Sequence, residues 1–284
     1  MNIRALFIDM DGTLLKSSNE ISTRNAEAIT KLSNRGVKVF LATGRQYEIT
    51  APYHRQLGLK TPMICLNGAS IYDGFTGKPA HMQTVQLDEE RFYRFTNELD
   101  CNVMVHTASG LYCNRRTEEL DAWSGKSRIR PRYIGDLRNA GYRDVLKYSV
   151  KTGQHGSRQS YLFRDAGDIV DWNDGFEIMA SGVSKWAGIE LLGKAFGIEP
   201  EETAAIGDGP NDIQMLQHAG ISAAMGNAGE EVKAAADIVT EHHEKDGLAE
   251  FIDQHLLKET AKVPGTALTA KVPVTPRDLQ NFVE

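Results

Sequence analysis

Short apolar runs alternate with helix-like stretches near both ends of the 284-residue chain. Ala5–Ile8 and Val37–Ala42 are apolar runs, and Asn25–Arg35 between them has helical periodicity that stops before Gly36. Pro62–Leu66 is a third apolar run. Such an alternation is typical of a parallel sheet covered by helices. We therefore predict an α/β fold.

The same order of elements returns late in the chain. Lys185–Phe196 is expected to be a helix that Gly197 closes. The other elements expected here are strands at Thr203–Ile206, Ile221–Met225 and, at an edge, Asp237–Thr240, and helices at Pro210–His218 and Leu248–Leu257. The two ends of the chain therefore build one α/β domain, formed by residues 1–82 and 183–257.

The middle of the chain, residues 83–182, is richer in Tyr, Trp and Arg. Tyr148–Val150 and Tyr161–Phe163 look like half-exposed strands, and Glu89–Leu99 looks like a helix. We predict a separate α+β domain inserted into the α/β domain. Residues 258–284 contain three prolines and are expected to form an extended tail. The alternative is that this tail packs on the core or on a second subunit.

Composition and charge exclude several classes of protein. The net charge of −6 argues against a nucleic-acid binder, which normally carries a basic surplus. No window approaches about 18 consecutive apolar residues, so no membrane span is expected, and the first residues do not resemble a signal peptide. The three cysteines are widely spaced, which favours a reducing cytoplasm over a disulfide framework. We expect a cytoplasmic monomer or weak homo-oligomer.

Polar clusters follow the apolar runs. Asp9-Met10-Asp11-Gly12-Thr13 follows the first run and Thr43-Gly44-Arg45 follows the second. Asn67-Gly68 and Gly207-Asp208-Gly209-Pro210-Asn211-Asp212 follow later runs in the same way. Because the carboxyl ends of parallel strands lie along one edge of a sheet, these clusters should converge in space.

The residue types in these clusters indicate phosphoryl transfer. Asp9, Asp11 and Asp208 would repel one another unless a cation joined them, and oxygen ligands without His or Cys select Mg²⁺. The Thr43 hydroxyl, the Gly44 N–H and the Lys185 ammonium are phosphate ligands. Carboxylates, Mg²⁺ and phosphate ligands together describe a phosphoryl-transfer site.

Other members of the clusters have two interpretations each. Gly12 and Asn67 are expected to bind phosphate or substrate, because they belong to the clusters that follow the first and third apolar runs. Asn211 contacts phosphate or is only a turn residue. Asp212 supports the metal or only stabilises the first turn of a helix, and Arg45 binds substrate or pairs with a surface acid.

Four strings, FIDMDGTLL, LATGR, GVSKWAG and GDGPNDIQML, resemble in order and spacing the motifs of the haloacid dehalogenase superfamily. Within it, the chain is similar to the Cof-type phosphatases with a class IIB cap. The resemblance covers about residues 3–257 and includes Asn67-Gly68-Ala69. It implies a Rossmann-like doubly wound core and an inserted, mobile α+β cap that selects the substrate.

The resemblance also implies roles for residues. Asp9 would be the nucleophile and a Mg²⁺ ligand, and Asp11 the general acid/base, with its backbone carbonyl on Mg²⁺. Thr43 and Lys185 would hold the phosphoryl group, and Asp208 would complete the metal site. The implied activity is Mg²⁺-dependent hydrolysis of small phosphorylated metabolites, sugar phosphates first, through an aspartyl phosphate.

Two alternative functions stay open, a phosphosugar mutase and a non-enzymatic protein that binds phosphorylated metabolites. A dehalogenase is disfavoured, because it would need neither a metal nor the acid Asp11. In the inserted domain, His106, Arg115 and Arg116 are candidates for substrate contact. The tail departs from the family pattern and leaves the oligomeric state open.

Overall fold

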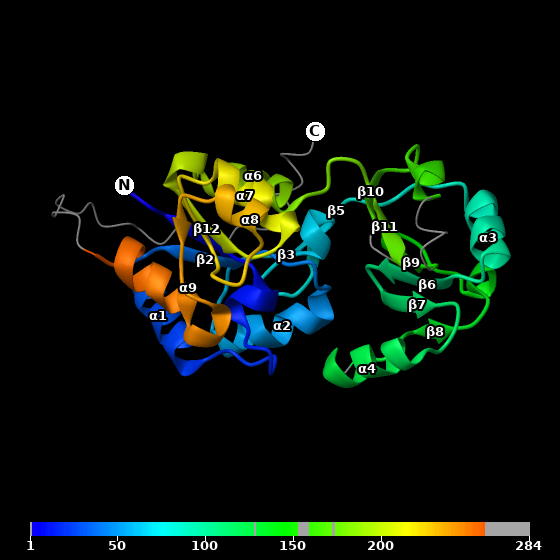
Figure 1. Cartoon of the computed structure of the whole chain (residues 1–284), viewed down its shortest axis with the longest axis horizontal. Helices are drawn as coiled ribbons and strands as arrows, with labels where there is room; N and C mark the ends of the chain where they lie inside the picture. The colour runs from blue at the N-terminus through cyan, green and yellow to red at the C-terminus, as the bar shows by residue number, and fades with distance from the viewer. Residues whose placement is uncertain (1, 128, 153–158, 172–173, 259–284) are drawn as a thin grey trace. The chain divides into compact units, whose positions relative to one another are not determined.

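The structure is a computed structural model that describes residues 2–127, 129–152, 159–171 and 174–258 (Figure 1). The predicted tail therefore lies outside the described residues, apart from Lys258. The chain divides into two compact units. The first contains the described residues up to His81 and from Ser184 onward, and the second contains Met82–Val183. The assignment of substrate selection to the inserted segment stays a prediction.

The first unit is built on a parallel sheet, whose strand order in the described residues is β14-β13-β12-β1-β2. Its strands are β1 (Ala5–Ile8), β2 (Lys38–Leu41), β12 (Thr203–Gly207), β13 (Ile221–Ala224) and β14 (Ile238–Val239). Ala5 of the central strand β1 is in register with Thr203 on one side and Lys38 on the other. All neighbouring pairs run parallel, so the strands end at the same edge.

Helices cover both faces of this sheet (Figure 1). They are α1 (Thr23–Asn34), α2 (Tyr47–Gln56), α6 (Lys185–Phe196), α7 (Ile213–His218), α8 (Glu230–Ala234) and α9 (Gly247–Phe251), which continues as a π-turn, Ile252–Leu256. Leu6 and Ile8 pack with α1 and α9 on one face. Phe7 packs with α6 and α7 on the other face, because successive strand residues point to opposite sides. The predicted doubly wound α/β fold is confirmed.

Local signals decide where helices begin and end. The Ser22 hydroxyl accepts the N–H of Asn25 and begins α1, and the Ser184 hydroxyl accepts the N–H of Ala187 and begins α6. After α6, Gly197 adopts the left-handed conformation with φ of 60°. The bounds of α6 agree with the predicted helix because both of its signals are local.

The third apolar run differs from the expectation. It forms β3 (Met63–Cys65), which pairs antiparallel with β4 (Ser70–Tyr72) in a small sheet completed by β5 (Pro79–Met82). A single parallel bridge, Ala42 to Ile64, connects it to the end of β2. The run is therefore a neighbour of the parallel sheet, and Asn67 still follows its carboxyl end.

The second unit contains a sheet whose order in the described residues is β10-β11-β9-β6-β7-β8. The strands are β6 (Asn102–Thr107), β7 (Gly110–Cys113), β8 (Tyr133–Ile134), β9 (Val145–Lys151), β10 (Asp168–Asp171) and β11 (Gly175–Met179). The helices are α3 (Glu89–Glu98) and α4 (Glu118–Ser127). Phe92 and Phe95 of α3 pack with Tyr148 and Phe176 in an aromatic core on one sheet face.

One strand predicted in this unit is wrong. Residues Tyr161–Phe163 lie in a 3₁₀ helix, Ser160–Phe163, and not in a strand. Phe163 is buried edge-on against Phe92 and Phe95, while Tyr161 is exposed. Three residues are too few to separate strand alternation from a single helical turn, and the aromatic core decides between them.

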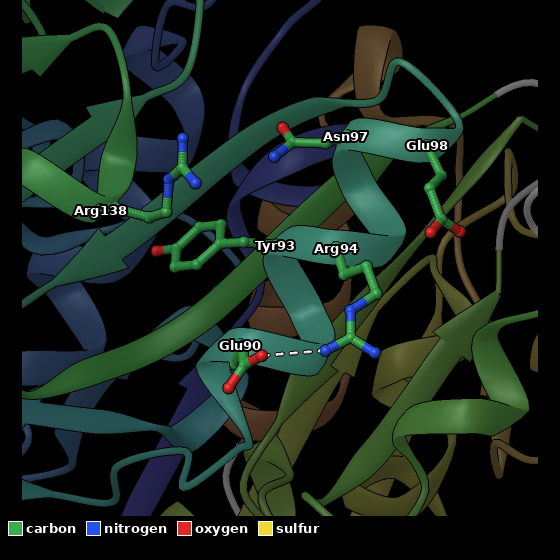
Figure 2. Close-up of a pocket in the computed structure, with 6 residues that line it drawn as sticks. All are labelled: Glu90, Tyr93, Arg94, Asn97, Glu98 and Arg138. Atoms are coloured by element: carbon green, nitrogen blue, oxygen red, sulfur yellow. Dashed lines mark hydrogen bonds and ion pairs between the residues drawn. The ribbon is translucent and has the colours of Figure 1, made fainter.

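A pocket of about 360 Å³ lies beside α3 in the second unit (Figure 2). Tyr93, Asn97 and Arg138 are among the residues that line it. Three of its charged side chains form ion pairs, since Glu90 contacts Arg94 at 2.9 Å and Arg138 contacts Asp136 at 2.7 Å. None of the helices in the described part of the chain has the length and apolar character that crossing a membrane requires.

Candidate active site

The loop after β1 carries the first polar cluster. Asp9 directly follows the strand, and the π-turn Met10–Leu14 bends the chain back. Gly12 adopts φ of 71°, and a Cβ on this residue would lie 2.2 Å from Oδ2 of Asp208. Only glycine fits such a close approach at positive φ. Gly12 therefore lets the Asp9 loop and Asp208 meet, a steric role distinct from the predicted phosphate contact.

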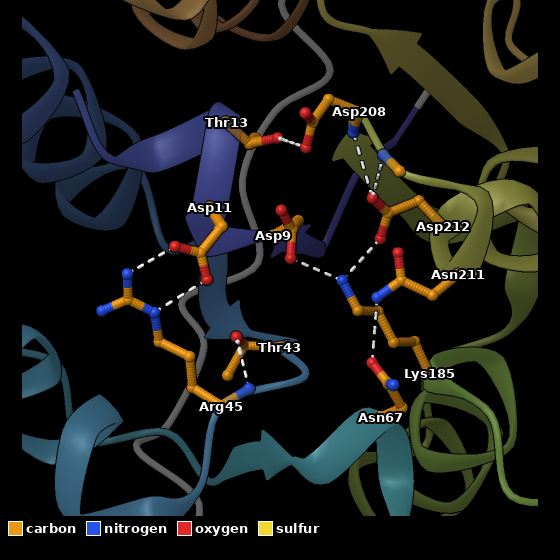
Figure 3. A network of polar contacts seen from close by, with 11 residues as sticks. Asp9, Asp11, Thr13, Thr43, Arg45, Asn67, Lys185, Asp208, Asn211 and Asp212 are labelled. Atoms are coloured by element: carbon orange, nitrogen blue, oxygen red, sulfur yellow. Dashed lines mark hydrogen bonds and ion pairs between the residues drawn. The ribbon is translucent and has the colours of Figure 1, made fainter. Parts of the chain in front are cut away.

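Lys185 lies between two carboxylates (Figure 3). Its Nζ donates to Oδ1 of Asp9 at 2.5 Å and to Oδ1 of Asp212 at 2.6 Å, and its side chain is fully buried. The other oxygen of Asp212 accepts the N–H groups of Asp208 and Gly209. Asp212 thus anchors both the ammonium and the loop after β12, and its support of a metal stays a prediction.

The site carries more negative charge than its single ammonium neutralises. Among the described residues, Asp9, Asp208 and Asp212 each offer an oxygen within 4.8 Å of the others. Burial raises the pKa of Asp9 to about 8; Lys185 opposes this rise, while Asp212 and Asp208 add to it. Burial lowers the pKa of Lys185, but Asp212 and Asp9 outweigh this and raise it. An oxygen-only donor set short of positive charge fits a hard divalent cation.

Asp208 is held at both oxygens. Thr13 Oγ1 donates to Oδ1 at 3.2 Å, and Asn227 Nδ2 donates to Oδ2 at 3.0 Å. Burial and the neighbouring Asp212 raise the pKa of Asp208. Asn227 is not among the predicted site residues, although it follows the carboxyl end of β13 as the predicted clusters follow their strands.

Asp11 points away from this acidic group and pairs with Arg45 (Figure 3). Arg45 Nε donates to Oδ2 of Asp11 at 2.7 Å, and Nη2 donates to Oδ1 of Asp11 and to Oδ1 of Asn19. The Asp11 side chain is 62% exposed. The carboxylate of Asp11 is therefore not among the clustered metal-ligand oxygens, and Arg45 pairs with an acid of the site itself.

Hydrogen bonds connect the remaining predicted residues of the site (Figure 3). Thr43 is buried, and its Oγ1 accepts the N–H of Arg45 at 3.1 Å. The N–H of Asn67 donates to the carbonyl of Thr43, and Asn211 Nδ2 donates to Oδ1 of Asn67. A Cβ on Gly44 would lie 3.1 Å from that same oxygen. Strand ends far apart in sequence thus meet, as the topology requires.

Residues 6–252 match the family model of haloacid dehalogenase-like hydrolases. The chain belongs to this family. The predicted resemblance is therefore confirmed, and the doubly wound core described above is the fold of its structural neighbours. A haloacid dehalogenase-like hydrolase from Bacteroides thetaiotaomicron has a TM-score of 0.80 at 24% identity, covering 88% of this chain and 98% of that chain.

Several relatives of this haloacid dehalogenase-like chain are named phosphatases. The 5-amino-6-(5-phospho-D-ribitylamino)uracil phosphatase YitU of Bacillus subtilis is 29% identical, covering 87% of this chain and 96% of the relative. The phosphatase YwpJ of the same organism is 30% identical, covering 90% and 100%. The structure of the subclass IIB sugar phosphatase BT4131 has a TM-score of 0.76 at 26% identity, covering 88% and 98%. The prediction of an enzyme of the phosphatase type is confirmed.

Proposed function

We propose that this chain is a Mg²⁺-dependent phosphomonoesterase that acts on small phosphorylated metabolites through an aspartyl phosphate. The observation that carries the proposal is the group of Asp9, Asp208 and Asp212, of which Asp9 and Asp212 are buried and share the Lys185 ammonium. Asp9 and Asp208, with the backbone carbonyl of Asp11, would hold the cation beside Asp212. When bound, Mg²⁺ would neutralise charge on Asp9 and on the phosphoryl oxygens.

The first step joins Asp9 to the substrate. A carboxylate oxygen of Asp9 forms a bond to phosphorus while the bond from phosphorus to the ester oxygen breaks. Asp11 donates its proton to that leaving oxygen, which departs as an alcohol. To do so, Asp11 must leave the two hydrogen bonds that Arg45 makes with its carboxylate.

The second step releases phosphate. Asp11, now a carboxylate, takes a proton from water as the water oxygen bonds to phosphorus and the bond to Asp9 breaks. Lys185 stays on Asp9 throughout and balances its charge. The Thr43 hydroxyl and the Gly44 N–H are the donors that would hold the phosphoryl oxygens.

We propose that the second unit, in which segment 83–182 lies, selects the leaving group. His106, Lys147, Ser149 and Glu177 project from neighbouring strands on the sheet face opposite the aromatic core. Lys147 Nζ donates to Glu177 Oε1 at 2.5 Å, and Ser149 Oγ lies 3.4 Å from His106 Nε2. Such a set of donors and acceptors suits a hydroxyl-rich group, so a sugar phosphate is the favoured substrate class.

Arg115 and Arg116 stay candidates for substrate contact. Arg115 pairs with Asp100 and Arg116 pairs with Asp121, each at 2.8 Å. A substrate would have to compete with these carboxylates for each guanidinium.

The test is a screen of the purified chain against sugar phosphates, pyridoxal phosphate and flavin mononucleotide, with Mg²⁺ or with EDTA. We expect release of inorganic phosphate with Mg²⁺ and loss of activity with EDTA or in Asp9→Asn. Full activity in EDTA, or substantial turnover by Asp9→Asn, would overturn the proposed mechanism. Production of an isomeric sugar phosphate without inorganic phosphate would favour a mutase.

A further inference from the structure

Asn227, in the loop that follows β13, connects the two acidic loops of the site. Its Nδ2 donates to the carbonyl oxygen of Gly12 at 2.9 Å and to Oδ2 of Asp208 at 3.0 Å. Its Oδ1 accepts the backbone N–H of His243 at 3.0 Å. Both amide hydrogens and the amide oxygen of this half-buried side chain therefore have partners.

These partners allow one orientation of the amide. Turned by half a rotation, the amide would bring its oxygen against the Gly12 carbonyl and the Asp208 carboxylate, and its NH₂ against the His243 N–H. Both contacts would be repulsive and would leave hydrogen-bonding groups without partners. Asn227 is therefore a fixed donor toward Asp208.

The fixed donor also sets the position of Asp208. Oδ1 of Asp208 accepts from Thr13 and Oδ2 accepts from Asn227, so each loop that borders the carboxylate holds one of its oxygens. The bond to Gly12 attaches the Asp9 loop to the same amide. The separation of Asp9 from Asp208, on which shared coordination of a cation depends, is thereby fixed before the cation arrives.

The segment that contains His243, whose N–H donates to Oδ1 of Asn227, supports this arrangement. Nδ1 of His243 lies 2.8 Å from the carbonyl oxygen of Leu15, at the exit of the Asp9 loop. In the same segment, Glu244 Oε1 accepts the N–H of Ser17 at 2.7 Å. The support for Asn227 therefore holds the Asp9 loop as well.

We propose that Asn227 is a positioning residue that orients Asp208 for the divalent cation and sets the affinity of the site for it. This inference rests on the proposed function, because it assumes that Asp9 and Asp208 share a cation. Hydrogen bonds to ligating carboxylates hold them in the geometry that the metal needs, and their loss typically weakens metal binding by about 10- to 100-fold.

The test measures Mg²⁺ binding to the full chain by isothermal titration calorimetry, without substrate, for wild type and Asn227→Ala. We expect Mg²⁺ to bind the variant about 10- to 100-fold more weakly. We also expect its kcat to recover toward that of the wild type as Mg²⁺ rises, with little change in the KM for substrate. Binding within twofold of the wild type would overturn the inference.

Asn114→Ala is the matched control. The Asn114 amide joins two backbone groups of the second unit, donating to the Cys101 carbonyl and accepting the Val103 N–H. Its loss should lower stability and leave Mg²⁺ affinity unchanged. If Asn227→Ala is unfolded, Asn227→Ser decides, because one hydroxyl cannot bond both Gly12 and Asp208. A wild type that binds no Mg²⁺ would contradict the proposed function, whereas equal binding by wild type and variant would contradict only this inference.

Discussion

Replacing Lys185 with methionine tests the charge arrangement at the centre of the site. Lys185→Met keeps an unbranched side chain of similar length at the start of α6 and removes one buried positive charge. The ammonium donates to Asp9 at 2.5 Å and to Asp212 at 2.6 Å, and all three side chains are buried. The variant therefore leaves two buried carboxylates without their common counter-ion.

The expected loss of stability follows from this burial. Removing one partner of a buried ion pair typically lowers the free energy of unfolding by about 3–5 kcal/mol. One ammonium serves both carboxylates, so the range applies once. Each 1 kcal/mol lowers Tm by about 2–4 °C in a protein of this size, which gives a decrease of roughly 6–20 °C. Burial already raises the pKa of Asp9, and loss of the opposing ammonium raises it further, so proton binding by Asp9 relieves part of this loss.

Thermal unfolding in EDTA, followed by circular dichroism, measures the effect. Lys194→Met is the matched control, since Lys194 is exposed on the same helix and its loss should change stability by less than about 0.5 kcal/mol. Added Mg²⁺ should narrow the difference in Tm between wild type and Lys185→Met, because it brings positive charge to the same carboxylates. A Lys185→Met variant as stable as wild type in EDTA would refute the reasoning.

Three further predictions concern single residues. Asp11→Asn should slow hydrolysis of alkyl phosphates by about 10²- to 10⁴-fold and of p-nitrophenyl phosphate far less, because the nitrophenolate needs no proton; equal losses in kcat would contradict a role as acid. Gly12→Ala places a Cβ 2.2 Å from Oδ2 of Asp208 and should raise the Mg²⁺ concentration for half-maximal activity; an unchanged Mg²⁺ titration would contradict this steric role. Burial, with Lys147 adding to it, holds the pKa of His106 well below 6.5, so the unfolded chain binds a proton that the folded chain does not. The free energy of unfolding should therefore fall as pH drops below 6.5, by at most about 1.4 kcal/mol per pH unit from this residue. Urea unfolding measures this free energy at each pH, and in His106→Asn it should depend less on pH.

Elements with signals inside their own segment were predictable. The helix Lys185–Phe196 has its cap and its closing glycine as immediate neighbours, and the structure has the same bounds. Met63–Cys65 is a strand, as predicted, but its antiparallel pairing was not predicted, and the turn at Tyr161–Phe163 was predicted as a strand. Both differences depend on contacts outside the segment itself. β3 pairs with β4, and Phe163 packs against the aromatic rings of α3. Local propensity does not contain these contacts.

The order of strands and polar clusters in the sequence indicated that three of the acidic and hydroxyl residues would meet at one edge of the sheet. Asp9, Thr43 and Asp208 each follow a buried strand, and parallel topology brings the ends of such strands to one edge whatever the length of chain between them. The tertiary structure alone decided which residues pair there. Lys185 donates a hydrogen bond to Asp9, 176 residues away in the sequence. Arg45 donates to Asp11, and Asn227 donates to Asp208. Hydrogen bonds and ion pairs depend on separations of a few tenths of an ångström and on direction, and only the packing of the assembled layers sets these.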